Sequence, residues 1–355
     1  MKMKYKFILI SVFSILPLFI FAQTDDDIDD FSVAETPRST IFQSLSSNTE
    51  IPKIILTANI KKIIKNKLNQ ESLKAEFEIT KDGQSEVWNI ELRARGKSRR
   101  RICHFPPIKF TFSKDDLKER GIRKKHNTIK LVSYCKDKIN YEKYVLREYV
   151  AYKMYNILTD YSFGVQLVQI EYRDSLNKIS PVTRYGILIE DTDEVAERLN
   201  AKEKSKYEYG RDSLDNFQYD VLTMYQYMIS NADFKIRALH NTKLIEDKDS
   251  KKYYAIPYDF DYSGFVNAEY SVPNPDFRQT HVTERIYLGE CRSAEKLAAV
   301  RELFISKKSE ILAAEKEMFT DKEHKRMMKF INSFYKILES DKKFKRKCLK
   351  KRWMN

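Results

Sequence analysis

Residues 75–95 read AEFEITKDGQSEVWNIELRAR, and their alternation of apolar and polar side chains predicts two antiparallel strands. The turn between them is expected at Asp82-Gly83, because an Asp-Gly pair between alternating segments is typical of a tight hairpin. On either side of this hairpin, apolar and polar side chains also alternate in residues 54–60 and 108–112. We therefore expect a β-rich front part that begins near residue 51.

Helical spacing dominates later in the chain. Apolar and aromatic side chains recur every three to four residues in several segments, which predicts amphipathic helices. The expected helices span residues 141–158, 193–207, 214–230 and 293–340, and further strands are expected at 128–132, 165–172, 183–189, around 244 and at 253–258. This order predicts an α+β fold with a β-rich N-terminal lobe, residues 51–190, and a mainly helical C-terminal lobe, residues 191–340.

The N-terminus has the pattern of a secretory signal peptide. Three lysines within the first six residues precede an apolar run over 7–21, and Ala22 supplies a small residue for cleavage. An uncleaved anchor is the alternative, but the run is short for a bilayer span of about 20 residues. We expect cleavage after Ala22 and a protein exported to the periplasm, the cell surface or the medium. Residues 23–50 are polar and acidic, so we expect a disordered linker there.

Charge and cysteine content restrict the partners and the chemistry. The chain has a net charge of +14, or +11 without the three signal-peptide lysines, which favours anionic partners such as acidic polymers or lipid headgroups. Cysteines occur at 103, 135, 291 and 348, and in an oxidising compartment a disulfide is expected. A Cys103–Cys135 bridge is our first choice, because each follows an expected strand end. The absence of a CxxC pair argues against a zinc site.

Polar residues gather around the expected hairpin at 241–258. Asp233 lies in the loop after a helix, Asn241 begins one strand, and Asp259 follows the end of the next, with Asp261 two residues on. The start of one hairpin strand and the end of the other are neighbours, so Asn241 and Asp259 should lie close together. An Asp that activates a hydroxyl, beside an Asn and an Asp that hold a divalent metal, suits phosphoryl transfer. Alternatively, these residues only form turns.

A basic turn precedes this region. Residues 93–101 place six cations and the Ser98 hydroxyl around Gly96, and Arg95 and Ser98 are candidates for binding phosphate oxygens. Lys109 alternates with apolar residues in the next strand, and Glu148 on the following helix is its expected ion-pair partner. A solvated basic face that binds any polyanion is the alternative.

Six motifs, in order, resemble the spore-coat protein H (CotH) kinase family. They run from about residue 54 to residue 265 and comprise Arg95-Gly96-Lys97-Ser98, Lys109, Leu146-Arg147-Glu148, Tyr185-Gly186-Ile187-Leu188-Ile189-Glu190, Asn231-x-Asp233 with His240-Asn241, and Pro257-Tyr258-Asp259-Phe260-Asp261. Two positions depart from the family pattern. Phe234 replaces the usual tryptophan beside the catalytic aspartate, and Tyr258 stands where a tryptophan often precedes the metal-binding aspartate.

The resemblance implies a two-lobed protein-kinase-like fold and ATP-dependent phosphorylation of protein hydroxyls with Mg²⁺ or Mn²⁺. It implies that Asp233 is the catalytic aspartate and that Asn241 and Asp259 bind metal, with Asp261 as a further candidate ligand. It also implies that Lys109 contacts nucleotide phosphates and that Glu190 lies near the adenine.

Two other functions remain open. The first is a catalytically silent envelope protein that binds a polyanion or a partner protein through the basic front. The second is a structural envelope protein whose basic tail, within residues 341–355, docks on acidic lipid headgroups, although a frayed, solvated tail also fits this composition. We expect a monomer without specific nucleic-acid binding, and the identity of the protein substrate is open.

Overall fold

The computed structural model describes residues 38–96, 98–138, 141–208, 210–290 and 292–348. The expected signal peptide at 1–22, the acidic residues 23–37, Lys97, Cys291 and residues 349–355 of the basic tail lie outside the described residues. None of the helices in the described ranges is long and apolar enough to cross a membrane.

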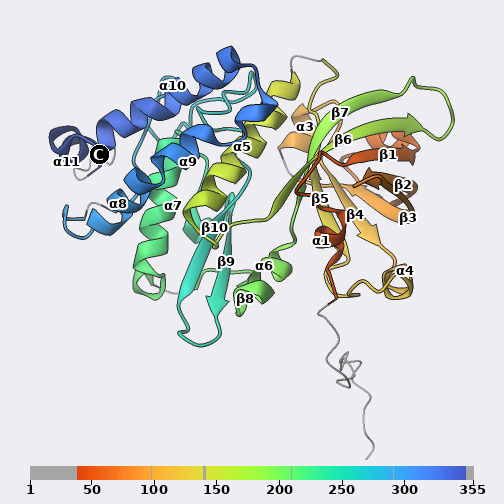
Figure 1. The fold of residues 1–355 in the computed structure, drawn as a ribbon, viewed down its shortest axis with the longest axis horizontal. Helices are drawn as coiled ribbons and strands as arrows, with labels where there is room; N and C mark the ends of the chain where they lie inside the picture. Colours follow the sequence, from red (N-terminus) through yellow and green to blue (C-terminus); the bar gives the residue numbers. More distant parts are fainter. Residues whose placement is uncertain (1–37, 97, 139–140, 209, 291, 349–355) are drawn as a thin grey trace, which may run out of the picture. The chain divides into compact units, whose positions relative to one another are not determined.

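The front part of the described chain is a closed β-barrel (Figure 1). Its strands are β1 (Lys53–Ala58), β2 (Leu73–Lys81), β3 (Gln84–Ala94), β4 (Ile108–Phe112), β5 (Thr128–Val132), β6 (Val165–Asp174) and β7 (Val182–Ile189). β1 pairs antiparallel with β2 on one side and parallel with β6 on the other. The ring closes because β7 pairs with both β5 and β6.

The β2–β3 hairpin forms as predicted and supplies much of the barrel interior. Asp82 and Gly83 both have positive φ, 50° and 75°, which is the geometry that a tight hairpin turn requires. Phe77 packs edge-on against Phe110 and Phe112, with ring centroids 5.4 and 5.6 Å apart. The alternating side chains of each strand therefore fill the barrel with aromatic rings on one face.

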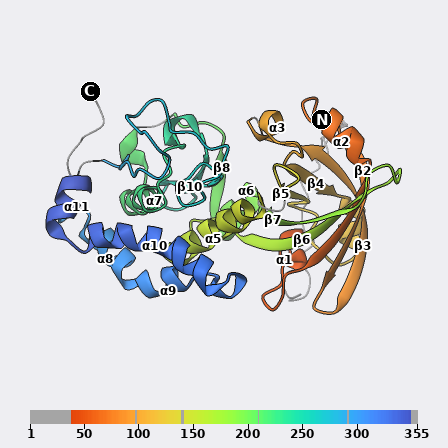
Figure 2. The ribbon, with the colours of Figure 1, turned by 90° about the horizontal axis from the view of Figure 1, so that it is seen from above.

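Helix α5 (Glu142–Leu158) packs on the outside of the barrel. The period of two in β7 separates two cores: Leu188 belongs to the barrel interior, whereas Ile187 and Ile189 pack with α5. Figure 2 shows α5 between the barrel strands and the C-terminal helices, and α5 contacts both β6 and α9 (Lys308–Ala313). It thus connects the two parts of the core.

The rest of the chain combines helices with a second, small sheet. The helices are α6 (Thr192–Arg198), α7 (Asn216–Met228), α8 (Ala298–Ser306), α9, α10 (Asp321–Leu338) and α11 (Asp341–Cys348). The sheet is antiparallel in the order β10-β9-β8, formed by β8 (Ala201–Lys204), β9 (Thr242–Asp247) and β10 (Tyr253–Pro257). Aromatic residues of α7 and α10, such as Tyr225 and Phe334, share one core with α5.

The expected two-lobed protein-kinase-like fold is wrong. The expected N-terminal lobe closes instead into a mixed barrel, and a separate small sheet lies among helices in the remainder. The closure depends on the parallel pairing of β1 with β6, which joins residues more than 100 positions apart. Periodicity in a single sequence carries no information about such a pairing, so it predicted the strands but not the ring.

Three segments also differ locally from expectation. The linker expected to reach residue 50 contains α1 (Ile41–Leu45), whose Ile41 and Leu45 are fully buried in the barrel core. The helix expected over 193–207 ends at Arg198 and is followed by β8. Residues 341–348 of the basic tail, for which a frayed end was expected, form α11, held by the buried side chains of Phe344 and Cys348.

Candidate functional site

The candidate site is built at one end of the β9–β10 hairpin. Asn241 immediately precedes β9, and its carbonyl oxygen accepts a hydrogen bond of 3.0 Å from the backbone N–H of Tyr258, which follows β10. Asn241 and Asp259 both have positive φ, 50° and 62°, a conformation that Asn and Asp tolerate better than most residues. The backbone of Asn241 therefore lies beside Tyr258, the residue that precedes Asp259.

Asp233 is held against Asn241. The Asn241 side-chain nitrogen donates to the carbonyl oxygen of Asp233 at 2.7 Å and to its carboxylate oxygen Oδ2 at 3.0 Å. The other carboxylate oxygen, Oδ1, lies 2.9 Å from His240 Nε2. Asp233 is partly exposed, so its carboxylate is oriented by two neighbours while a substrate can still reach it.

The Asp259–Asp261 turn is anchored to α5. The backbone N–H of Asp259 donates to the hydroxyl of Tyr152 at 2.8 Å, and the ring of Phe260 packs against the Tyr152 ring with centroids 4.7 Å apart. Phe260 is fully buried, whereas Asp259 is partly exposed. The buried aromatic contact therefore fixes the turn and leaves the Asp259 carboxylate at the surface of the site.

Arg99, at the start of the short helix α3 (Arg99–Ile102), neutralises two buried carboxylates behind this turn. Its guanidinium lies 3.6 Å from Glu148 of α5 and 3.7 Å from Asp261, and all three side chains are less than 10% exposed. Arg99 also donates to the carbonyl oxygen of Ser133 at 3.1 Å. The expected Lys109–Glu148 ion pair is thus replaced by an Arg99–Glu148 pair.

Burial controls the protonation of this cluster. Burial, with a further contribution from the neighbouring Asp259, raises the pKa of Asp261 to about 7 against the opposing effect of Arg99. Burial likewise raises the pKa of Glu148 well above its ordinary value, and Arg99 opposes this shift. Burial lowers the pKa of Arg99, but the acidic groups around it raise this pKa by more, so the net shift is upward. Arg99 therefore stays charged and lowers the pKa of both carboxyls, but burial keeps each pKa above its ordinary value.

The predicted disulfide lies directly beside Arg99. Cys103 and Cys135 are bonded, with sulfur atoms 2.17 Å apart, which confirms the predicted pairing. The N–H of Cys103 donates to the carbonyl oxygen of Arg99, and Cys135 lies two residues after Ser133, whose carbonyl oxygen accepts from Arg99. The disulfide thus ties together the two segments that hold the arginine.

Cations from both sheets border the site. Lys109 lies opposite Arg93 and Lys130 in the barrel register, on the face that points away from the barrel interior. Within the described residues Lys109 makes no ion pair, whereas Lys130 pairs with Asp191 at 3.0 Å. Burial lowers the pKa of Lys130, Asp191 opposes this effect, and Arg95 and Lys243 lower the pKa further.

The influence of Arg95 and Lys243 on the pKa of Lys130 indicates that these three cations lie near one another. Arg95 follows β3, Lys130 is on β5, and Lys243 is on β9, so the barrel and the small sheet both contribute positive charge. Such a set of cations suits a ligand with several negative charges, such as a polyphosphate chain.

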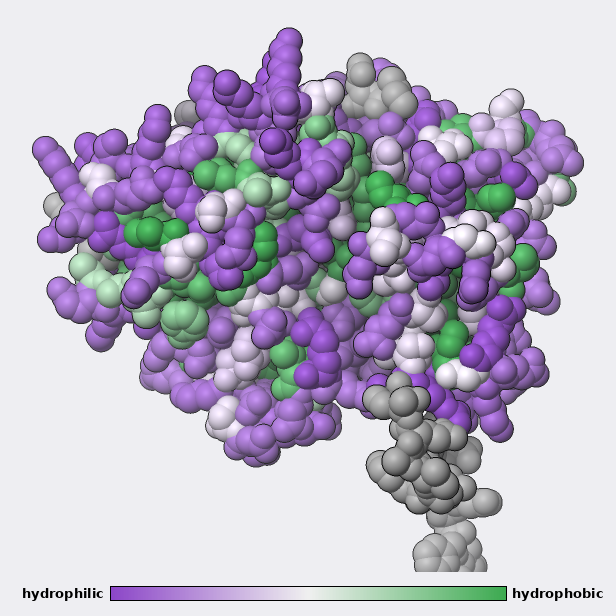
Figure 3. Space-filling view, viewed as in Figure 1, coloured by the Kyte–Doolittle hydropathy of each residue, from purple (hydrophilic) through white to green (hydrophobic). Residues whose placement is uncertain are grey.

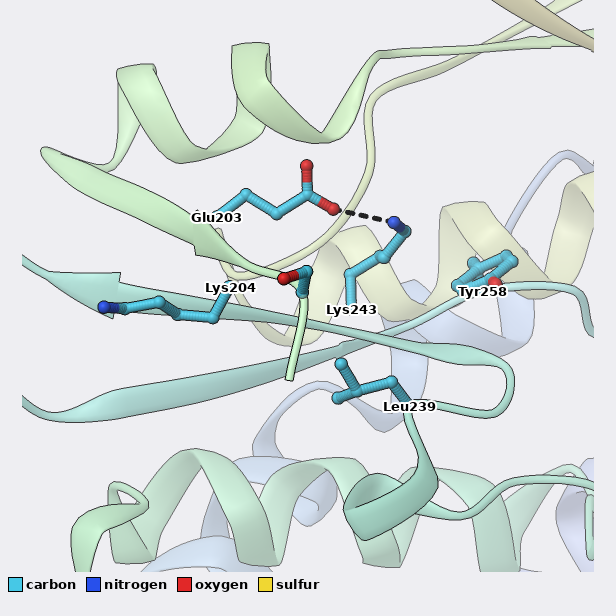
Figure 4. Close-up of a pocket in the computed structure, with 6 residues that line it drawn as sticks. Glu203, Lys204, Leu239, Lys243 and Tyr258 are labelled. Carbon is cyan, nitrogen blue, oxygen red and sulfur yellow. Dashed lines mark hydrogen bonds and ion pairs between the residues drawn. The ribbon is translucent and has the colours of Figure 1, made fainter. Parts of the chain in front are cut away.

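A pocket of about 420 Å³ opens beside Tyr258 (Figure 4). Its lining residues are Glu203, Lys204, Ser205, Leu239, Lys243 and Tyr258. Glu203 and Lys243 point toward each other and form an ion pair of 2.7 Å, with Tyr258 beyond Lys243. The pocket therefore offers the aromatic ring of Tyr258, the ion-paired Lys243 and the apolar side chain of Leu239, and Tyr258 directly precedes Asp259 in the chain.

The structure places Glu190 in a buried position and Ser98 in an exposed one. Glu190 is 4% exposed and binds Arg198 at 2.8 Å and the N–H of Gly164 at 2.7 Å, so its carboxylate is occupied within the fold. Ser98 is exposed and begins α3 without a side-chain capping bond. Neither contacts the Asp233–Asn241 pair in the described structure.

Two residues of the candidate metal site fit a divalent cation. Among the described residues, no group of three or more His, Cys, Asp or Glu side chains is arranged to hold a metal. Magnesium, however, is commonly bound by one or two carboxylates together with substrate phosphates and water. The side-chain nitrogen Nδ2 of Asn241 donates to Asp233, and its side-chain oxygen Oδ1 accepts no hydrogen bond from a described residue. Asn241 and Asp259 can supply two oxygens, whereas Asp261 is buried beside Arg99.

Sequence reasoning missed Arg99, Lys130 and Lys243 as site residues. Lys130 had a usable signal, because it interrupts a strand between the apolar residues Ile129 and Leu131. Arg99 was only one of several consecutive arginines, and Lys243 was one of many lysines. The position of these three residues at the site depends on how the barrel strands and the small sheet pack, and no local sequence pattern describes that packing.

The chain matches no protein-family model, and no curated protein shows a significant match to it. The resemblance to the CotH kinase family therefore stays a prediction from the six motifs.

Proposed function

We propose that this protein is a phosphotransferase that moves a phosphoryl group from a nucleotide such as ATP to a protein hydroxyl, with Mg²⁺ or Mn²⁺ as cofactor. The observation that carries the proposal is the double role of Asn241, which binds Asp233 through its side chain and the Asp259 turn through its backbone. One residue thereby joins a candidate base to a candidate metal ligand.

The surroundings of this trio support the same chemistry. The pocket beside Tyr258 has room for part of a nucleotide, and Lys243 borders both the pocket and the cation group with Arg95 and Lys130. Phosphoryl transfer needs little covalent chemistry from the protein, because positioning and charge stabilisation lower most of the barrier. A site of oriented carboxylates and cations meets these requirements.

In the proposed reaction Asp233 accepts the proton of the acceptor hydroxyl. The hydroxyl oxygen forms a bond to the terminal phosphorus as the bond from that phosphorus to its bridging oxygen breaks, leaving a nucleoside diphosphate. Asn241 and His240 keep the Asp233 carboxylate oriented for this proton transfer. Asn241 and Asp259 would hold the divalent metal, which supplies positive charge to the phosphate oxygens when it is bound.

We further propose that the protein works outside the cytoplasm. The signal-peptide pattern of residues 1–22 supports this location, and so does the Cys103–Cys135 disulfide, because such bonds persist mainly in oxidising compartments. A nucleotide donor is scarce in such compartments, so the donor is the first property to identify by experiment.

The proposed function is tested by thermal unfolding of residues 23–355 with ATP and Mn²⁺. A ligand at about 100 times its dissociation constant should stabilise the folded state by about 2.7 kcal/mol. Asp259→Ala should lose this metal-dependent stabilisation, whereas Asp233→Ala should keep it. In a phosphotransfer assay Asp233→Ala should be about 10² to 10⁴ times slower than the unmodified protein, as expected for loss of a general base.

Lys74→Ala is the matched control, because Lys74 is exposed on strand β2, makes no ion pair with a described residue, and its loss should leave the Asp233–Asn241–Asp259 geometry intact. Absence of any nucleotide-dependent stabilisation in the unmodified protein would overturn the proposal. A catalytically silent polyanion-binding protein would then be the better description.

A further inference from the structure

The last described segment, residues 321–348, concentrates positive charge. It carries ten Lys and Arg side chains and four Asp and Glu side chains, a net +6 of the +14 in the whole chain. The cations are Lys322, Lys325, Arg326, Lys329 and Lys336 on α10, and Lys342, Lys343, Lys345, Arg346 and Lys347 on α11. Less than a tenth of the chain thus holds over a third of the net charge.

The four acidic residues of this segment form no ion pairs with its ten cations. Asp321, Glu339 and Asp341 form ion pairs with Lys316, Lys308 and Arg301, which all lie outside the segment. The fourth, Glu323, completes the capping box with Thr320 at the start of α10. Not one of the ten cations forms an ion pair with a described residue. Arg326 and Lys345 lie near enough to Glu323 and Glu295 to lower the pKa of those carboxyls, so the positive charge of the segment is compensated only in part within the described fold.

The α10 cations form a stripe along one side of the helix, the α10 stripe: Lys322, Lys325, Arg326, Lys329 and Lys336. At 100° per residue all five fall within an arc of about 100°, and all five are exposed. The opposite side carries Met328, Ile331 and Phe334, which are buried in the core. From Lys322 to Lys336 the stripe is about 21 Å long at 1.5 Å per residue.

The surface around the stripe is hydrophilic. In the space-filling view, hydrophilic side chains project from the edge along which α10 runs in Figure 1 (Figure 3). None of the exposed large hydrophobic side chains of the described chain comes from α10 or α11. The apolar sides of both helices are occupied by internal packing, so contact with a partner through this face must be electrostatic.

We propose that the α10 stripe docks the protein onto a bilayer surface rich in anionic lipid headgroups. A flat anionic surface can reach an outward-facing helix along its whole length without a groove. Eight of the ten cations are lysines, which act as flexible point charges and suit diffuse headgroups better than the bidentate recognition that arginine provides. Clustered basic residues bind such membranes without inserting apolar side chains.

The inference is tested with vesicles and the processed protein, residues 23–355. Vesicles of phosphatidylcholine with 25% phosphatidylglycerol should bind the protein in 0.1 M salt, and pure phosphatidylcholine vesicles should not. The triple variant Lys325→Gln, Lys329→Gln, Lys336→Gln should bind the anionic vesicles on the order of 100 times more weakly. Binding should also be lost at 0.5 M salt, because exposed charges are then screened.

The matched control is the triple variant Lys61→Gln, Lys65→Gln, Lys74→Gln. It removes the same charge from exposed lysines of the barrel part, and it should bind vesicles nearly as well as the unmodified protein. Equal losses in both triple variants would contradict the docking site, because binding would then follow net charge alone. Binding to soluble polyphosphate without binding to vesicles would replace the lipid surface by a linear polymer.

Discussion

Arg99 is the cation that compensates the buried carboxyl groups of the site. It is the cation shared by Glu148 and Asp261, and the nitrogen Nε of Arg99 and one oxygen of each carboxylate have no hydrogen-bond partner among the described atoms. The interaction is therefore mainly Coulombic. Removing one partner from a buried ion pair commonly costs about 3 to 5 kcal/mol, since it leaves an uncompensated charge.

We expect Arg99→Met to lower the free energy of unfolding by about 3 to 5 kcal/mol at pH 8. The loss should be smaller at pH 5, because Glu148 and Asp261 can then be protonated in the folded state and no longer need a cation. Urea unfolding at both pH values measures this difference. A loss that is equal at pH 5 and pH 8 would show that Arg99 contributes packing and not charge.

For individual residues, the sequence predicted which polar side chains gather at the end of the hairpin, but it did not predict which cation pairs with Glu148. Asn241 binds Asp233 through its side chain and Tyr258, next to Asp259, through its backbone, because hairpin pairing is local and Asn and Asp favour such ends. Lys109 was selected by its alternation with apolar residues, but that alternation places it on the outer barrel face and does not specify Glu148 as its partner.

Among the structural elements, the short helix α3 and the end of β5 are joined by the disulfide. The bond links residues 32 positions apart, and closing a loop of that length in the unfolded chain is worth about 3 to 4 kcal/mol. Because Arg99 lies in α3 and binds Ser133 near Cys135, loss of the bond should also loosen the arginine.

The double variant Cys103→Ser, Cys135→Ser should therefore unfold at lower urea concentration, with a free energy of unfolding about 3 to 4 kcal/mol below that of the unmodified protein. The unmodified protein treated with a reductant should show the same loss. If the reductant destabilises the double variant equally, another cysteine is responsible, and the assignment to Cys103–Cys135 fails.

Strands and long helices were predicted well, whereas short tertiary-dependent elements were not. Strands β4 and β5 match their expected ranges, because alternation of apolar residues is strong over five residues. Helix α1 was missed because five residues cannot show helical periodicity, and it forms only where Ile41 and Leu45 enter the barrel core. Strand β8 was missed for a similar reason, since it exists by pairing with β9.

On the scale of the whole molecule, buried acids shape the pH dependence of stability. Burial raises the pKa of Glu194 to about 7; the Thr40 hydroxyl, which donates to its carboxylate, and Arg123 lower it, while Glu190 and Asp191 raise it. An unfolded Glu loses its proton near pH 4.5, so between about pH 4.5 and 7 the folded state binds more protons. This group therefore makes the protein less stable as the pH rises through that window.

Glu194→Gln should reduce the decline in stability between pH 5 and pH 8, with the variant more stable than the unmodified protein at pH 8. Glu197→Gln, on the same helix, is the control with the opposite sign. Although burial alone would raise its pKa, Lys125, Arg123 and His126 lower the pKa of Glu197 to about 2, so this substitution should cost stability above about pH 4.5. Parallel pH profiles for both variants would contradict the assignment.

The sequence alone predicted most strands, the long helices α5 and α7, Cys103–Cys135 as the first-choice pair and the pairing of the hairpin ends next to Asn241 and Asp259, because each depends on periodicity, turn chemistry or neighbouring strand ends. The barrel closure, the pairing of Arg99 with Glu148 and the pocket beside Tyr258 could not be predicted from the sequence. These features arise where segments distant in sequence pack together, and the register and burial of such contacts are properties of the whole fold.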